Sequence, residues 1–116
     1  MKKNIILEKS FDFALMVIDI YKYLTVEKHE YIMSKQLLRS GTSIGANCNE
    51  AIAAVTTKDF CNKMAIASKE TYETLYWLKL LDKSDYYHSD EAIENCEEII
   101  RIITSIVKTT KEKLHS

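Results

Sequence analysis

Apolar side chains recur every three or four residues along most of this chain, which is the period of an amphipathic α-helix. Four such segments are expected, at about 4–25, 30–55, 57–82 and 90–114. The 116 residues contain no proline and only two glycines, whereas a β-sandwich or barrel would need turn residues far more often. The pattern therefore predicts one all-α domain over 1–116, folded as an up-down-up-down antiparallel four-helix bundle.

Residues at the expected helix ends agree with this division. Thr56 and Asp59 have the spacing of a capping box, and Ser89 or Asp90 can cap the last helix. The last segment begins with acidic residues and ends with lysines, which complements the dipole of a helix. These local signals make the third and fourth helices well defined.

The first and fourth segments carry more apolar residues than a single core face requires. The additional stripes consist of Phe11, Leu15 and Ile18 in the first segment and of Ile99, Ile102 and Ile106 in the fourth. Because an isolated bundle needs one buried face per helix, we expect these stripes to be covered between the subunits of a homo-oligomer. A wider core within one subunit is the alternative.

Composition narrows the class of protein. Hydrophobic residues make up 47% of the chain and charged residues 28%, with a formal net charge of −1, which is typical of a globular domain rather than a strongly basic nucleic-acid module. No apolar run is long enough to span a membrane, and no signal peptide is recognisable. Cys48, Cys61 and Cys96 are dispersed and odd in number, so we expect buried free thiols in the cytoplasm rather than a disulfide or zinc site.

Motifs for catalysis, metal binding or cofactors are not found. The segment "GTSIG" lacks the GK[ST] ending of a phosphate-binding loop and follows no strand. Di-iron bundles carry the Glu-x-x-His pattern on two helices, and this chain does not have it on two. We therefore expect no catalytic residue, no metal and no cofactor.

The enzyme alternative is a Mg²⁺-dependent all-α nucleotide pyrophosphohydrolase. Glu70 and Glu73 share one helix face, and Glu91 and Glu94 share another, and paired carboxylates on two helices can hold Mg²⁺. Acidic residues in a first helical turn are also favoured by the helix dipole alone, which explains Glu91 and Glu94 without a metal.

Both glycines of the chain, Gly41 and Gly45, lie one turn apart in a segment that is otherwise helical. A glycine in a helix interior costs about 1 kcal/mol relative to alanine, so a compensating interaction is expected. A close crossing of two helices is the simplest one, and Ser40, Thr42 and Ala46 keep the surroundings small.

Two stretches of the sequence resemble a known family. They are "LLRSGTSIGANCNEA" at 37–51 and "FCNKMAIASKETYETLYWLKLL" at 60–81, and they are similar to the bacterial four-helix-bundle family of 23S rRNA intervening-sequence proteins. The matching positions are Leu38, Arg39, Ser43, Ile44, Ala46, Asn47 and Glu50, followed by Phe60, Lys63, Met64, Ile66, Ala67, Lys69, Glu70, Glu73, Thr74, Tyr76, Trp77 and Leu78.

The resemblance implies a four-helix bundle in a ring-like homopentamer. Members of the family were noticed as reading frames inside insertions of 23S rRNA genes. The accessory proteins of diversity-generating retroelements are similar in fold, bind nucleic acid and partner a reverse transcriptase. No catalytic residues are established for the family, so none are carried over.

Polar residues of the two stretches are expected to form a structural network. Its candidate members are Arg39, Ser43, Asn47 and Glu50 on the second helix and Glu70 and Glu73 on the third. Acidic groups beside Ile66 and Trp77 indicate partial burial, and buried acids need partners. We expect Arg39 to pair with Glu70 or Glu73, and Asn47 with Glu50 or with backbone groups. A ligand site is the alternative.

Basic residues form two candidate stripes for nucleic acid. They are Lys28, Lys35 and Arg39 on the second helix and Arg101, Lys108 and Lys111 on the fourth. An oligomer would repeat each stripe into a basic ring, while a solvated helix face is the alternative. Few aromatic residues accompany the stripes in the sequence, which does not favour stacking on single strands.

Together these patterns predict a non-enzymatic scaffold that forms a homo-oligomer and binds RNA or an RNA-handling protein. The alternative is an assembly or adaptor factor that contacts only proteins.

Overall fold

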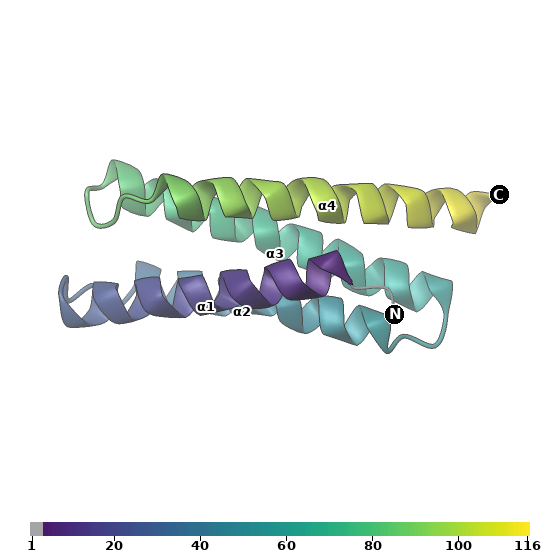
Figure 1. The fold of residues 1–116 in the computed structure, drawn as a ribbon, viewed down its shortest axis with the longest axis horizontal. Coiled ribbons are helices and arrows are strands. Elements are labelled where there is room, and N and C mark those ends of the chain that lie inside the picture. Colours follow the sequence, from purple (N-terminus) through teal and green to yellow (C-terminus); the bar gives the residue numbers. More distant parts are fainter. Residues whose placement is uncertain (1–3) are drawn as a thin grey trace.

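A computed structural model describes residues 4–116, and within this range the chain is all-α, with four helices and no strand. The helices are α1 (Ile5–Val26), α2 (Met33–Ile52), α3 (Thr57–Lys83) and α4 (Asp90–His115). They lie side by side in an elongated molecule of 50 × 25 × 22 Å (Figure 1). None of the four is long and apolar enough to cross a membrane. The helical class predicted from the apolar period is therefore confirmed.

The helices are neighbours in the order in which they occur in the chain. α2 packs between α1 and α3, and α4 packs against α3 and, more sparsely, against α1. The α1–α2 and α3–α4 connections lie at one end of the molecule, and the α2–α3 connection lies at the other (Figure 1). The seam between α1 and α4 is consequently the least tightly packed side.

One apolar face of α1 is buried in the core. Its buried apolar side chains are Ile6, Phe13, Val17, Ile20 and Leu24. Phe11 and Leu15, from the additional stripe of this helix, are 63% and 50% exposed. This part of the additional stripe is therefore available for contact with another molecule.

The additional stripe expected on α4 is only partly external. Ile99 is 1% exposed and belongs to the core, together with Ala92, Cys96 and Ile103. Ile102 and Ile106 are partly buried and pack against the same core. The wider core accounts for this stripe, because the inward face of α4 has to meet both α3 and α1.

The start of α2 differs from the expected boundary near residue 30. Glu30 lies outside the helix, and its carboxylate accepts hydrogen bonds from the backbone N–H groups of Ile32, Met33 and Ser34 at 3.2, 3.1 and 2.7 Å. The Ser34 hydroxyl donates in return to the Glu30 carbonyl at 2.7 Å. The helix begins at Met33 because this buried carboxylate satisfies the N–H groups that have no partner within the helix.

α2 also ends earlier than expected, at Ile52 rather than near Val55. The side-chain oxygen of Thr56 accepts a hydrogen bond from the Asp59 N–H at 3.0 Å, which caps α3. This role requires an extended backbone at Thr56, with φ −124° and ψ 159°, so the chain must leave the helix before it. Val55 lies in the resulting turn and is almost fully exposed.

The cap of α4 is Ser89 rather than Asp90. The Ser89 hydroxyl accepts a hydrogen bond from the Ala92 N–H at 3.1 Å, and Asp90 is the first residue of the helix.

The three cysteines are buried and free, and burial raises the pKa of Cys48 to about 11 and that of Cys96 to about 12. Both thiols therefore remain protonated and poorly nucleophilic at neutral pH.

Candidate functional site

The two glycines of α2 face α1 at a close crossing. A Cβ atom built on Gly41 would lie 2.8 Å from both γ-methyl groups of Val17, which is closer than such atoms approach one another. A Cβ atom on Gly45 would meet the Ser10 hydroxyl at 3.2 Å. Gly41 therefore leaves no space for a side chain, and the packing of Val17 against its backbone offsets the low helix propensity of glycine.

A group of polar side chains joins α2 to α3, and we call it the α2–α3 polar cluster: Arg39, Glu70, Glu73 and Trp77. The Arg39 guanidinium donates to the Glu70 carboxylate at 3.2 Å and also pairs with the Glu73 carboxylate. The indole N–H of Trp77 donates to Glu73 at 3.2 Å. Glu73 and Trp77 can meet in this way because residues four apart share one face of a helix.

The cluster lies at the edge of the core rather than within it. The Arg39 side chain is 48% exposed, while those of Glu70 and Glu73 are 14% and 31% exposed. The hydrogen bond from Arg39 holds the pKa of Glu73 below its ordinary value and raises the pKa of Arg39. Both carboxylates pair with the same guanidinium, so the cluster connects two helices.

The side chains of the other expected members do not contact the charged side chains of this cluster. The Ser43 hydroxyl donates to the Arg39 carbonyl at 2.7 Å, and the Asn47 amide donates to the Ser43 carbonyl at 2.8 Å, both within α2. Glu50 pairs with Lys63 at 2.9 Å. The expected set of six is thus divided, because these side chains lie successively farther along α2 and bond to the groups nearest to each.

Replacing Glu73 with glutamine is expected to reduce the loss of stability at acidic pH. The pKa of Glu73 is lower in the folded chain than in the unfolded chain, so its carboxylate stabilises the fold above the unfolded pKa of about 4.3. That contribution is lost as the pH falls through the folded pKa. Urea denaturation measures the free energy of unfolding at pH 7 and at pH 3. The difference between these two values should be smaller in the variant by up to about 1 kcal/mol.

The control for this experiment is Glu94→Gln, which alters an exposed carboxylate that makes no ion pair within residues 4–116. Its dependence on pH should remain close to that of the unaltered protein. Equal behaviour of the two variants would show that the pairing with Arg39 contributes nothing to stability.

The candidate nucleic-acid residues lie at two ends of the molecule. Lys28 and Lys35 are exposed near the α1–α2 connection, whereas Lys108 and Lys111 are exposed near the C-terminal end of α4 (Figure 1). Arg101 is exposed about midway along α4. One chain therefore does not bring the two expected stripes together.

Arg39 is bound to two carboxylates, so it is not a free cation for phosphate.

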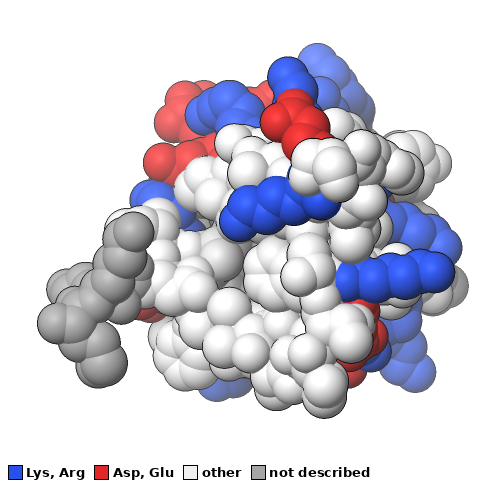
Figure 2. Space-filling view, turned by 90° about the vertical axis from the view of Figure 1, so that its right-hand side faces the viewer, with Lys and Arg blue, Asp and Glu red and all other residues white. Residues whose placement is uncertain are grey.

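Figure 2 views the molecule from the end that contains the C-terminus. Lysine and arginine side chains extend across this end, with uncharged side chains between them. Acidic side chains lie beside several of the basic ones, so this end of the molecule is mixed in charge.

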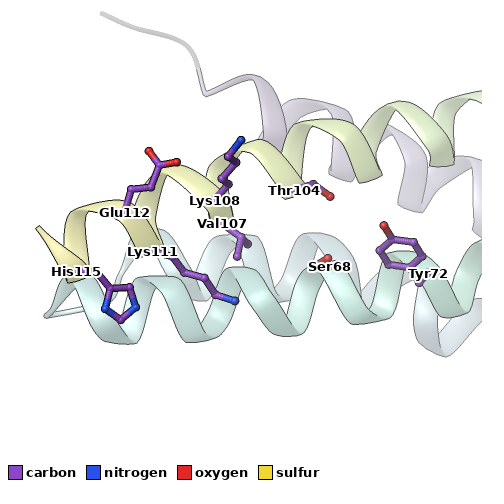
Figure 3. A pocket seen from close by; sticks show the side chains of 8 residues that line it. All are labelled: Ser68, Tyr72, Thr104, Val107, Lys108, Lys111, Glu112 and His115. Atoms are coloured by element: carbon purple, nitrogen blue, oxygen red, sulfur yellow. The ribbon is translucent and has the colours of Figure 1, made fainter.

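Beside these lysines, α3 and α4 border an open groove of about 530 Å³ (Figure 3). We call it the α3–α4 groove. Its lining residues are Ser68, Tyr72, Thr104, Val107, Lys108, Lys111, Glu112 and His115. The aromatic ring of Tyr72 on α3 thus lines the same groove as two lysines of α4.

Tyr72 was missed from the sequence because it lies on a different helix from the lysines. The spacing of Ser68 and Tyr72, one turn apart on α3, is the only local signal that these residues share a face. Which face meets α4 depends on the rotation of α3 about its own axis. That rotation is fixed by the whole core.

The carboxylates considered for Mg²⁺ lie in two separate places. Glu70 and Glu73 are bound by Arg39, and Glu91 and Glu94 lie in the first turns of α4 with their side chains exposed. Within the described part of the chain, no three His, Cys, Asp or Glu side chains are grouped so that they could hold a metal ion.

The fold and the site define an all-α protein of four helices, with a polar cluster between α2 and α3 and a partly basic groove between α3 and α4. The chain belongs to the 23S rRNA-intervening sequence protein family, whose pattern matches residues 2–108. This confirms the resemblance seen in the sequence. No curated protein matches the chain.

A solved structure from Bacteroides thetaiotaomicron VPI-5482 is similar to this chain over most of both lengths. The sequences are 44% identical, the TM-score is 0.87, and the match covers 89% of this chain and 98% of the other. That protein is described as one of unknown function from the S23 ribosomal protein family. The similarity establishes a shared fold and family.

Proposed function

We propose that this protein is a non-enzymatic scaffold that forms a homo-oligomer and binds RNA or an RNA-handling protein. The observation that carries the proposal is the free basic surface of α4. Arg101, Lys108 and Lys111 are exposed, and none of them makes an ion pair within residues 4–116. Unpaired cations on one helix are suited to contact a phosphate backbone.

The unit of the proposed assembly is an up-down-up-down antiparallel bundle in the cytoplasm, and the assembly is a ring-like homopentamer, as the family resemblance implies. The positions of the three connections support this topology (Figure 1). The exposed apolar side chains of Phe11 and Leu15 on α1 support contact between subunits. Rotational symmetry would present the basic surface of α4 once per subunit, so that several weak phosphate contacts act together.

Combining Arg101→Gln with Lys108→Gln is expected to weaken RNA binding and its dependence on salt. Each phosphate that the variant no longer neutralises should reduce the slope of log K against log salt by roughly 0.7 to 1. The measurement is fluorescence anisotropy of a labelled RNA with a hairpin and single-stranded flanks, titrated at several salt concentrations. Light scattering in parallel gives the size of the oligomer.

The matched control is Lys22→Gln, which removes an exposed lysine of α1 that makes no ion pair in the described range. It should leave the salt slope unchanged. No binding of the RNA at low salt would overturn direct RNA binding and leave a protein partner as the ligand.

A further inference from the structure

We propose that the α3–α4 groove is a nucleotide-binding site, in which Tyr72 stacks on the base and Lys111 contacts the phosphate. The nucleotide is either a free mononucleotide or an unpaired nucleotide of an RNA chain, and these two sources share the same chemistry. Only the second source rests on the function proposed above.

The groove presents complementary groups from two helices. Thr104, Lys111 and His115 lie on one stripe of α4 that borders the groove. In Figure 3 the ammonium group of Lys111 extends toward α3, and the side chain of Val107 also points toward α3. Lys108 and Glu112 project from the opposite side of α4 in this view. Lys111 is therefore the cation best placed to reach a ligand in the groove.

Tyr72 supplies a free aromatic surface. It is 56% exposed, and its ring forms no pair with another aromatic ring in the described part of the chain. Tyr76, one turn further along α3 and 58% exposed, instead packs edge-on against Trp77 with ring centroids 5.1 Å apart. Of these two exposed tyrosines, Tyr72 is the one that lines the groove.

The size and lining of the groove fit a ligand that combines an aromatic ring with a negative charge. Its volume of about 530 Å³ lies within the range of about 300–1,000 Å³ that is usual for small-molecule sites. Val107 offers an apolar contact, and the hydroxyl groups of Ser68 and Thr104 can hydrogen-bond a sugar or a base. Bases stack on tyrosine without strong preference for sequence, and lysine contacts phosphate.

An RNA nucleotide can enter this groove only if its base is unpaired, because stacking on Tyr72 requires an exposed base face. The proposal therefore expects tighter binding of single-stranded RNA than of a duplex with the same number of phosphates. Binding through exposed lysines alone would not produce this preference.

The test compares Tyr72→Ala, Tyr72→Phe and Tyr76→Ala, using adenosine 5′-monophosphate and a labelled ten-nucleotide oligoadenylate as probes. Calorimetry measures the mononucleotide, and fluorescence anisotropy measures the oligonucleotide. Tyr72→Ala should weaken binding about 5- to 100-fold, in line with the loss of one stacked base, whereas Tyr72→Phe retains the ring and should bind nearly as well. Tyr76→Ala, which removes an equally exposed tyrosine of the same helix, should have no effect.

Loss of affinity for the mononucleotide in Tyr72→Ala supports a site for free nucleotide, and loss for the oligonucleotide alone supports a site for RNA. Oligonucleotide binding that is equally strong in Tyr72→Ala overturns the groove as a site but leaves RNA binding by the α4 lysines intact. No binding of either probe overturns the groove and removes support for RNA binding. A change of oligomer size in Tyr72→Ala without a change of affinity also overturns the proposal, since the groove would then lie in a subunit contact.

Discussion

Replacing Gly41 with leucine is expected to force α1 away from α2 and to lower the free energy of unfolding by about 3 kcal/mol or more. Even a Cβ atom at this position would lie 2.8 Å from two methyl groups of Val17. Val17 is fully buried and β-branched, so its χ1 angle is strongly restricted and its methyl groups do not move aside readily. Gly41→Ala should cost less, about 1 kcal/mol, because alanine regains helix propensity. Urea denaturation followed by circular dichroism measures both.

Gly45→Ala is the control for this crossing. Its Cβ atom would meet the Ser10 hydroxyl at 3.2 Å, a contact that a shift of a few tenths of an ångström relieves. The gain in helix propensity should balance this contact and leave stability within about 0.5 kcal/mol of the unaltered protein. Adding Val17→Ala to Gly41→Ala should cost less than the sum of the two single changes, since the clash disappears. If leucine at position 41 left the free energy of unfolding as high as leucine at position 45 does, the close crossing at Gly41 would be contradicted.

Glu30→Ala is expected to lower the free energy of unfolding by about 2–4 kcal/mol, although a residue before a helix is often replaceable. Its carboxylate accepts from three backbone N–H groups, and it lies in a buried position. Removing the acceptor leaves the buried N–H of Ser34 without a partner, which costs about 1–3 kcal/mol, and the loss of the cap on the part-buried N–H groups of Ile32 and Met33 adds to this. Thermal and urea denaturation measure the change.

Glu30→Gln should fall between the alanine variant and the unaltered protein, because an amide keeps one acceptor oxygen and loses the charge. The control is Glu27→Ala, which removes an exposed acidic residue from the same connection. If Glu27→Ala were as destabilising as Glu30→Ala, loss of negative charge rather than of the cap would be responsible.

The helical class was predictable because the signals that define it are local. The period of Phe13, Val17, Ile20 and Leu24 marks a buried helix face without reference to any other segment, and all four are buried. The caps at Thr56 and Ser89 likewise depend on residues only three positions apart in the sequence. The family resemblance rested on similar short-range patterns and is confirmed.

Pairings between side chains of different helices were harder to predict from the sequence, since they depend on how far each helix is rotated about its axis. Glu50 meets Lys63, a partner that was not expected, whereas Asn47 takes the backbone partner that was one of its two expected ones. Tyr72 shares a groove with residues of α4 that follow it by more than thirty positions. Glu30 looked like the first residue of a helix because the sequence does not reveal that its side chain folds back onto the backbone. Such features require the positions of side chains in space.

The order in which the helices pack has a consequence for how rapidly the chain can fold. The most extensive helix interfaces join α2 to α3, α1 to α2 and α3 to α4, all of them consecutive and linked by short connections. Only the sparse seam between α1 and α4 brings together segments from opposite ends of the chain. Most of the packing can thus form after closing short loops, which is a topology of low contact order, and helical proteins of this kind fold within microseconds to milliseconds.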